Sequence, residues 1–364
     1  MALGAIVGAA LTTPGAAAPR LWIDGTNVLT GSAGAGVDVS GVTISSGLDD
    51  TAGELTATFG DPALAYTLPA RATVMLYDGA TDTILYSGRL TARDVVPDFG
   101  QQGRSTQLRA TDWSERLDGS YVTAIYYPSG LTDQAMVQSL CGIFGRGELV
   151  TFPYVLNTAT MPAMAFGGQS LRSAIEQVAI QAAGDLTGQR HYYVDPQKRL
   201  HYFLTESNAA PKNLNSVVSG TEIAPSDLSI SYDDSAIRTA VLVRGGTAAG
   251  SGYVVNGAAV ALYGWVADQL DAPDSITAAQ KAAYGNGYLA PRSVPVVRGS
   301  FTVDQSSGWA AGQTILVTNT ALGLAARSFY LTAVEREFVS GGYSRYRVAF
   351  GARPRSLLRQ VGRN

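Results

Sequence analysis

The two histidines of the chain, His191 and His201, are its strongest candidates for metal or acid–base chemistry. Both lie in residues 191–203 (HYYVDPQKRLHYF), which are typical of a β-hairpin that turns at residues 195–198. With those four residues in the turn, Tyr192 lies opposite His201. Opposed residues share a face while neighbours alternate, so the two imidazole rings are expected on opposite sides of the ribbon. The sequence therefore predicts no zinc site and favours packing among tyrosines.

The single cysteine, Cys141, is the other candidate nucleophile. It falls on one face of an expected helix together with Met136, Val137, Leu140 and Phe144, and it has no partnered histidine or basic residue nearby. A thiol in such an apolar stripe is predicted to be buried and structural. One cysteine also excludes an intrachain disulfide.

Acidic residues gather at Asp49, Asp50, Glu54 and Asp61, but without the spacing and central glycine of a calcium loop. A solvated acidic loop is the favoured interpretation. The adjacent Asp233 and Asp234 could in principle cleave glycosides, but the sequence does not give the distance between the two carboxyl groups, and nothing else marks them as catalytic.

Other chemical signatures are missing from the sequence. The glycine-rich stretches 31–36 and 245–252 are not followed by helices, and neither a phosphate loop nor a nucleophile elbow is present. Aromatic residues alternate with arginines only at 343–347, inside an expected strand, and the net charge of −3 does not indicate nucleic-acid or membrane binding. The sequence predicts no enzyme activity, no cofactor and no metal.

One hairpin pattern occurs twice, at residues 73–92 and 314–333. Thr73 and Thr314, Leu90 and Leu331, and several further pairs are each 241 positions apart, with no gap. A constant offset across two strands and their turn favours duplication over chance resemblance between hairpins. With 364 residues, the chain is expected to hold more than one domain. We therefore expect a mainly β protein with two related β-barrel domains, residues 20–118 and 229–352, flanking an α/β insertion.

The insertion, residues 119–228, has helical periodicity. Thr132 is placed to cap a first helix, and a second is expected from Ser170 to Ala183, ahead of the hairpin at 191–203. In the second β-domain, strands are expected at 239–244, within 254–265, at 294–303 and at 343–350, with a helix over 276–289 capped by Ser275.

Both ends of the chain are expected to lie outside the folded domains. Residues 1–19 lack a positive region before their apolar part, and the apolar run of about 10 residues is too short to span a bilayer. They indicate a flexible arm and no stable membrane insertion, with a retained or cleaved signal peptide as the alternative. The last residues, 353–364, hold four arginines and no acid. Such a tail is often only solvated, but it is our candidate for docking on an acidic partner surface. The candidate interface residues are Arg353, Arg355, Arg359 and Arg363.

The order of these features resembles the central hub proteins of bacteriophage tail tips and baseplates. The similarity rests on LYSGRLTA (85–92), the hairpin at 191–203, the alanine-rich TAAQKAAY (277–284), GQTILVT (312–318) and YLTAVEREF (330–338). It covers roughly residues 20–352 and consists of spacing and residue type, without chemical signatures.

The resemblance implies a structural protein in which two barrels per chain line a tube and three chains form a ring. Its implied partners are the distal tail protein, the tail tube and the tape measure protein above, and a central fibre or spike below, with DNA passing through. The implied location is the virion, after assembly in the cytoplasm of the bacterial host. Many hubs continue into an enzymatic or fibre-bearing extension, and none is expected in this sequence.

Two other classes of function stay open. A hexameric distal-tail or adaptor ring explains the second β-domain and the helices less well, and a mass measurement in solution distinguishes it from a trimer. A carbohydrate-binding or carbohydrate-cleaving tail-tip protein would use the aromatic-rich β-surfaces, and a glycan or cell-wall turnover assay tests for it.

Overall fold

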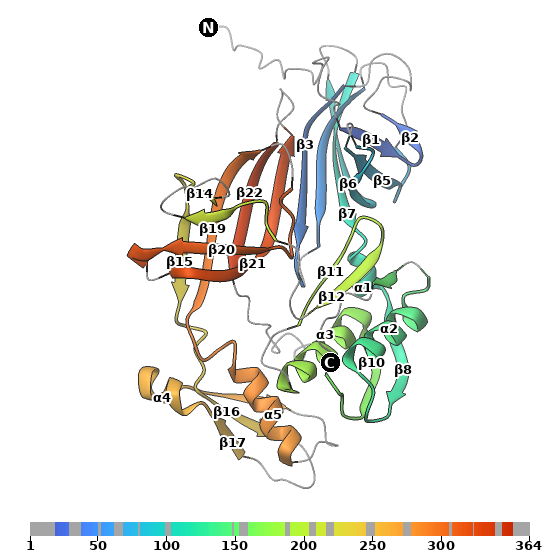
Figure 1. Cartoon of the computed structure of the whole chain (residues 1–364). Coiled ribbons are helices and arrows are strands. Elements are labelled where there is room, and N and C mark those ends of the chain that lie inside the picture. The colour runs from blue at the N-terminus through green and yellow to red at the C-terminus, as the bar shows by residue number, and fades with distance from the viewer. Residues whose placement is uncertain are drawn as a thin grey trace.

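The computed structural model of the protein is mainly β with few helices, as predicted (Figure 1). It describes residues 19–28, 38–49, 52–61, 68–78, 81–98, 103–147, 149–152, 159–185, 190–203, 209–215, 222–244, 252–271, 278–305, 308–322, 324–338 and 344–351. Residues 1–18 of the N-terminal arm and the arginine-rich C-terminal residues, 353–364, lie outside this part of the chain.

The first β-domain is one layer of long strands that curls onto short ones. Its strand order is β3-β4-β7-β6-β5-β1, followed by β2. Alternate side chains of the long strands point into a common core, which includes Leu55, Ala57, Leu108 and Ala110. The strands are β1 (Arg20–Ile23), β2 (Thr26–Asn27), β3 (Asp38–Gly47), β4 (Glu54–Asp61), β5 (Thr73–Tyr77), β6 (Ile84–Asp98) and β7 (Gly103–Asp112).

The second β-domain has the same strand order, β15-β19-β22-β21-β20, continued by β13 and β14. Its core includes Phe301, Ile315, Leu331 and Val348. The strands are β13 (Asn213–Asn215), β14 (Glu222–Ile223), β15 (Ser229–Asp233), β19 (Val296–Gln305), β20 (Thr314–Asn319), β21 (Leu324–Phe338) and β22 (Ser344–Gly351), with a 3-10 turn η1 (Thr320–Leu322).

The repeated hairpin has one register in both domains. Thr73 pairs with Arg89 in the first domain, and Thr314 pairs with Tyr330 in the second, and the next three pairs also agree at the offset of 241. Each long strand then has a register shift at the same place, between Leu90 and Ala92 and between Leu331 and Ala333. The shared bulge is further evidence, beside the shared strand order, that the two domains are related, because bulges are specific features of a fold. The two hairpins therefore occupy equivalent positions, as the constant offset predicted.

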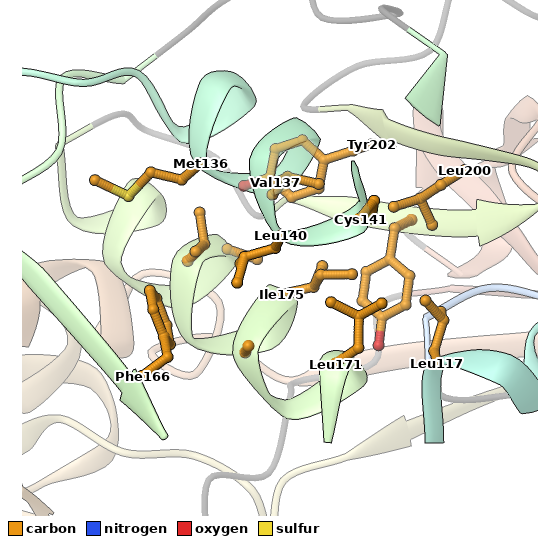
Figure 2. Packing of buried hydrophobic residues seen from close by; sticks show 14 of the residues in the cluster. Leu117, Met136, Val137, Leu140, Cys141, Phe166, Leu171, Ile175, Leu200 and Tyr202 are labelled. Carbon is orange, nitrogen blue, oxygen red and sulfur yellow. The ribbon is translucent and has the colours of Figure 1, made fainter. Parts of the chain in front are cut away.

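The helical region between the domains has its own core, which Figure 2 shows. Thr132 caps α2 by accepting a hydrogen bond from the Ala135 amide at 3.2 Å, as predicted. Leu140 and Cys141 of α2 pack with Ile175 of α3 in this core. The elements are α1 (Glu115–Gly119), β8 (Tyr121–Tyr127), α2 (Asp133–Phe144), β9 (Val150–Phe152), β10 (Met164–Ser170), α3 (Leu171–Asp185), β11 (His191–Val194) and β12 (Arg199–Phe203).

A small unit is inserted between β15 and β19. Its sheet, in the order β17-β16-β18, packs against α5, and α5 in turn packs on α3. Of the range 254–265, in which one or two strands were expected, only the end of β17 is a strand. The rest is largely helical, because Asn256 caps α4 by accepting from the Ala259 amide at 3.2 Å. The elements are β16 (Ala240–Arg244), β17 (Gly252–Val255), α4 (Gly257–Tyr263), β18 (Ala267–Asp271) and α5 (Ala278–Leu289).

Ser275, the expected cap of the last helix, lies outside the described residues.

Within the described ranges, no helix is both long and apolar enough to cross a bilayer.

The core of the helical region gives a stability prediction. Leu140→Ala leaves a cavity between α2 and α3, because this side chain is fully buried, so we expect the free energy of unfolding to fall by roughly 2–5 kcal/mol. Ile143→Ala is the matched control on the same helix. Ile143 is 56% exposed, and its truncation should change the free energy by less than about 1 kcal/mol. Chemical denaturation followed by circular dichroism measures both, and equal losses would contradict this account of the core.

Candidate assembly surface

The two β-domains are joined edge to edge through their backbones. The end of β21 pairs antiparallel with β3, from Ala333 opposite Gly47 to Glu337 opposite Thr43. Among the described residues, this joint merges both domains into one sheet of 14 strands. Backbone pairing along five residues leaves little freedom for either domain to rotate on the other.

Because the domain is duplicated, each strand of this joint has an equivalent strand elsewhere in the chain, and these two equivalents are not paired with each other. At the offset of 241, residues 333–337 of β21 correspond to residues 92–96 of β6. β15 pairs with β19 in the second domain as β3 pairs with β4 in the first, so β15 is the equivalent of β3. In the described part of the chain, β6 pairs along residues 92–96 only with β7, and β15 pairs only with β19. Both edges therefore present unpaired backbone groups where their equivalents are joined.

Large apolar side chains are exposed at these two edges. Val95 on β6 is 53% exposed, and Tyr232 on β15 is 46% exposed. An edge strand with exposed apolar side chains is a template for pairing with another chain, and proteins usually cover or charge such edges. These residues make both edges our candidates for docking surfaces.

The hairpin of β11 and β12 contacts both β-domains. At the end of β3, the Asp49 amide donates to the Tyr192 carbonyl at 2.8 Å, and Asp49 Oδ1 accepts from the Tyr192 amide at 3.1 Å. The other carboxylate oxygen, Oδ2, lies 3.0 Å from His191 Nδ1. The ring of His191 packs against Tyr330 of β21, with ring centroids 4.7 Å apart. The hairpin thus holds the first domain and the second at their junction.

Arg172 of α3 strengthens the same region from the helical side. Its guanidinium donates to the Asp49 carbonyl at 2.8 Å, to the Ser114 carbonyl at 3.0 Å and to Asp118 Oδ1 at 2.7 Å. Burial alone would lower the pKa of this guanidinium, but the neighbouring Tyr192 and Asp118 raise it above its usual range. Arg172 therefore stays charged and links α3 to the end of β3 through its hydrogen bond to the Asp49 carbonyl.

The predicted orientation of the histidines is wrong. The turn has three residues, 196–198, in place of the four expected: the Asp195 amide donates to the Arg199 carbonyl at 2.9 Å, and Lys198 lies in the left-handed region at φ 66°. His201 consequently pairs with Tyr193, and both histidines lie on the same face of the ribbon. A turn with a left-handed third residue is a common hairpin geometry that glycine usually marks, and lysine gave no such signal.

Sharing a face does not make the histidines a metal site. Each has its own carboxylate, His191 with Asp49 and His201 Nε2 with Asp195 Oδ2 at 2.9 Å. His201 also stacks on Tyr193 with ring centroids 4.4 Å apart, which agrees with the expected packing among tyrosines. In the described ranges, no group of three or more histidine, cysteine or acidic side chains is placed to hold a metal ion.

The remaining sequence candidates are separated in space or occupied. Cys141 is buried as predicted, and burial raises the pKa of its thiol to about 12. Asp49 is buried and paired, so the expectation of a solvated acidic loop is wrong for that residue, while Glu54 is exposed on β4. Asp233 accepts hydrogen bonds from Ser235, which lower the pKa of its carboxyl.

Several candidates fall outside the described residues. These are Asp50, the side chain of Asp61, Tyr343, Arg353, Arg355, Arg359 and Arg363.

Sequence reasoning missed a fully buried ion pair. Arg190 Nε lies 2.8 Å from Asp133 Oδ2, and both side chains are inaccessible to solvent. Asp133 also accepts from the Ala159 amide at 3.0 Å and from the Tyr202 hydroxyl at 3.3 Å. Asp133 follows a helix cap, where an acidic residue is ordinarily solvated, so the sequence offered no signal of its burial. Removal of one partner from such a pair leaves a buried charge and is strongly destabilising.

Comparisons with known proteins identify the fold. No protein-family profile matches the sequence, and no curated protein matches it. The structure is similar to a tail protein from Neisseria meningitidis MC58 (TM-score 0.64, 13% identity, 92% of this chain and 96% of that one). It is also similar to the 43 kDa tail protein of prophage MuSo2 from Shewanella oneidensis (TM-score 0.66, 13% identity, 92% and 98%).

A third similar structure comes from a secretion machine. It is an E. coli component of the type VI secretion system, itself described as structurally similar to the T4 bacteriophage tail proteins gp27 and gp5 (TM-score 0.53, 14% identity, 93% and 77%).

The hairpin of β11 and β12 gives a prediction of how stability depends on pH. Burial alone would raise the pKa of the Asp195 carboxyl, but hydrogen bonds from His201 and Arg199 outweigh burial and hold that pKa below its usual range. A carboxyl with a lowered folded pKa stabilises the protein above its unfolded pKa of about 4, and this contribution is lost as the pH falls further. Asp195→Asn should therefore weaken the fall in unfolding free energy as the pH drops below about 4.

Thermal unfolding at a series of pH values measures this slope. Asp24→Asn, in the exposed turn after β1, is the control and should keep the wild-type slope. An unchanged slope in Asp195→Asn would show that the hairpin carboxylate does not contribute.

The agreement over nearly the whole of both chains confirms the resemblance at the level of fold: this chain has the fold of bacteriophage tail proteins.

Proposed function

We propose that this protein is a non-enzymatic structural hub of a bacteriophage tail tip or baseplate, and that three copies close into a ring. The observation that carries the proposal is the joint between β21 and β3, together with its two unused counterparts on β6 and β15. The fold shared with phage tail proteins supports it. The domain limits proposed for the hub are those from the sequence, 20–118, 119–228 and 229–352, except that β13 and β14 of the middle range pair into the sheet of the second β-domain.

The duplication specifies how two chains meet. In the joint within the chain, Glu335 lies opposite Ser45 and Arg336 opposite Ile44. Transferred to the free edges, the same register places Asp94 of one chain opposite Ser231 of the next, and Val95 opposite Ile230. Ile230 already packs against the core of the second domain, so this register covers Val95 with apolar surface.

The joint is head to tail, because β6 of one chain meets β15 of the next. Head-to-tail contacts either close into a ring or grow into a filament. Closure is favoured here because the joints within and between chains are equivalent, so a ring of three chains has six similar joints. Such a ring matches a six-fold tail tube on one side and a three-fold fibre or spike on the other.

The remaining partners follow from this position. The distal tail protein, the tail tube and the tape measure protein are proposed above the ring, the central fibre or spike below it, and DNA is proposed to pass through the channel. The proposed location is the virion, after assembly in the host cytoplasm.

Engineered disulfides test the joint between chains. Paired residues of antiparallel strands lie within the Cα distance that a disulfide requires. Asp94→Cys with Ser231→Cys should therefore give, on mild oxidation, a non-reducing ladder that ends at three chains. The native Cys141 does not compete, because it is buried and its thiol pKa is about 12.

The equivalent pair within the chain is the matched control. Ser45→Cys with Glu335→Cys occupies the observed joint and should lose its free thiols without forming a ladder. Asp94→Cys alone should also form none. A ladder that ends at six chains would favour the hexameric adaptor ring. If the control pair oxidises while Asp94→Cys with Ser231→Cys stays monomeric, the proposed ring is wrong.

The arginine-rich end gives a further prediction. Deletion of residues 353–364 should leave the melting temperature unchanged, because in the sequence they follow the last expected strand and show little apolar patterning. We expect it to weaken binding to a neighbouring tail protein, since arginine binds carboxylates through paired hydrogen bonds. Replacing Arg353, Arg355, Arg359 and Arg363 by glutamine separates charge from chain length. Tail assembly by both variants at the wild-type level would show that these arginines are only solvated.

A further inference from the structure

The small unit inserted between β15 and β19 has one covered face and one open face. Val254 of β17 packs in the core under α5, where its side chain lies against Gly285. Neighbouring residues of a strand point to opposite faces, so Tyr253 and Val255 point away from α5. Both are exposed, and the Tyr253 ring lies edge-on to that of Trp265, with ring centroids 5.4 Å apart. The face opposite α5 is therefore apolar and open.

Helix α4, between Tyr253 and Trp265 in the sequence, is itself almost uncovered. Of its seven residues only Ala259 is buried, and Leu262 is 76% exposed. Within the described part of the chain, α4 packs closely on no other helix or strand. Short helices are marginal in water and take most of their stability from packing of an apolar face. Residues 252–267 also contain no charged side chain, so α4 and its flanks have the composition of a covered surface.

The helical region has a similar surface on the ribbon of β8 and β10. Phe166 of β10 points into the core of this region, so its neighbour Ala165 points outward. Ala165 pairs with Tyr126 of β8, and the two share a face. Tyr126 is 67% exposed, and neither strand has a charged residue. The ribbon therefore presents a second uncharged surface, centred on Tyr126.

The connections of the chain place these two surfaces at neighbouring positions of the proposed ring. The small unit follows β15, and the helical region follows β7, which pairs with β6. When β6 of one chain meets β15 of the next, the helical region of the first chain therefore lies beside the small unit of the second. Within one chain, α5 already packs on α3, whereas α4 and β8 lie at the two outer sides (Figure 1). The outer sides are thus the ones that face the neighbouring chains.

We propose that α4 and β17 of one chain pack on the β8–β10 ribbon of its neighbour, and that this contact closes a second ring beside the ring of β-domains. This inference rests on the proposed ring and adds a second interface to it. Small units and helical regions alternate around the second ring. They are joined within each chain by α5 on α3, and between chains by the two apolar surfaces.

The two interfaces contribute differently to assembly. Pairing of β6 with β15 fixes the direction and register of neighbouring chains through backbone hydrogen bonds. Burial of Leu262, Trp265 and Tyr126 supplies affinity, because large apolar and aromatic side chains dominate the binding energy of protein interfaces. Neither apolar surface carries a charge that would have to be desolvated when the chains meet.

Two double variants that differ only in the sign of one charge test this contact. Leu262→Lys with Tyr126→Glu places opposite charges on the two surfaces, and Leu262→Lys with Tyr126→Lys places like charges there. Both lose the same apolar groups, and both positions are exposed in the single chain, so each variant should fold.

Analytical ultracentrifugation of a dilution series measures the concentration at which each ring dissociates. At low salt, the opposite-charge ring should dissociate at a concentration at least about tenfold lower than the like-charge ring, because like charges across an interface repel. This difference should shrink as the salt concentration rises.

The control moves the lysine to another exposed leucine. Leu316 lies on β20, outside both surfaces. Leu316→Lys with Tyr126→Glu and Leu316→Lys with Tyr126→Lys should form rings of equal stability. Both rings should be weaker than the wild-type ring, because each has lost the Tyr126 side chain.

The outcomes separate the two proposals. Absence of a ring in the wild-type protein at every concentration would overturn the proposed function, and this inference with it. A wild-type ring together with no effect of the charge sign at position 126 in the Leu262→Lys background would overturn the inference alone, as would an equal effect in the control. Unaltered rings that no longer bind a neighbouring tail protein would also overturn it, and would assign these surfaces to that protein.

Discussion

The architecture depends on the hydrogen-bonding requirement of strand edges. A backbone edge must be paired, covered or solvated, and the pairing of β21 with β3 satisfies it within the chain. That joint makes one sheet of two domains and aligns the cores on one side and the polar side chains on the other. The hairpin of β11 and β12 contacts both sides of this joint, since Asp49 stands at the end of β3 and Tyr330 stands in β21.

Charge is used differently in the helical region and on the sheet. The pair of Arg190 and Asp133 is fully buried and surrounded by further hydrogen bonds, so its loss would leave an unsatisfied charge in the core. The pairs of β21 and β22 are exposed and add little to stability. Arginine therefore has two roles in this protein, to organise a core and to balance a surface.

Some features could be predicted from the sequence because they depend on nearby residues. The cap at Thr132, the apolar stripe with Cys141 and the constant offset of the hairpins all have local signatures. The prediction of the turn was wrong because lysine rarely adopts the left-handed conformation of Lys198. The helix after Asn256 was predicted as strand because a short run of alanine and valine suits either structure. The joint of β21 with β3 has no side-chain signature at all, since backbone pairing accepts almost any residue.

In the proposed ring, the joint within each chain and the joint between chains are encoded by different codons, although they are equivalent in position. A single-domain subunit in a six-membered ring must repeat every substitution at all six contacts, whereas this chain can alter three and leave the other three unchanged. The pairs show both outcomes: an acid opposite serine is kept in Glu335–Ser45 and in the inferred Asp94–Ser231, whereas Arg336 opposite Ile44 corresponds to Val95 opposite Ile230. In the proposed ring, duplication thus separates the contact that holds a chain together from the contact with its neighbour, so each can evolve its own strength.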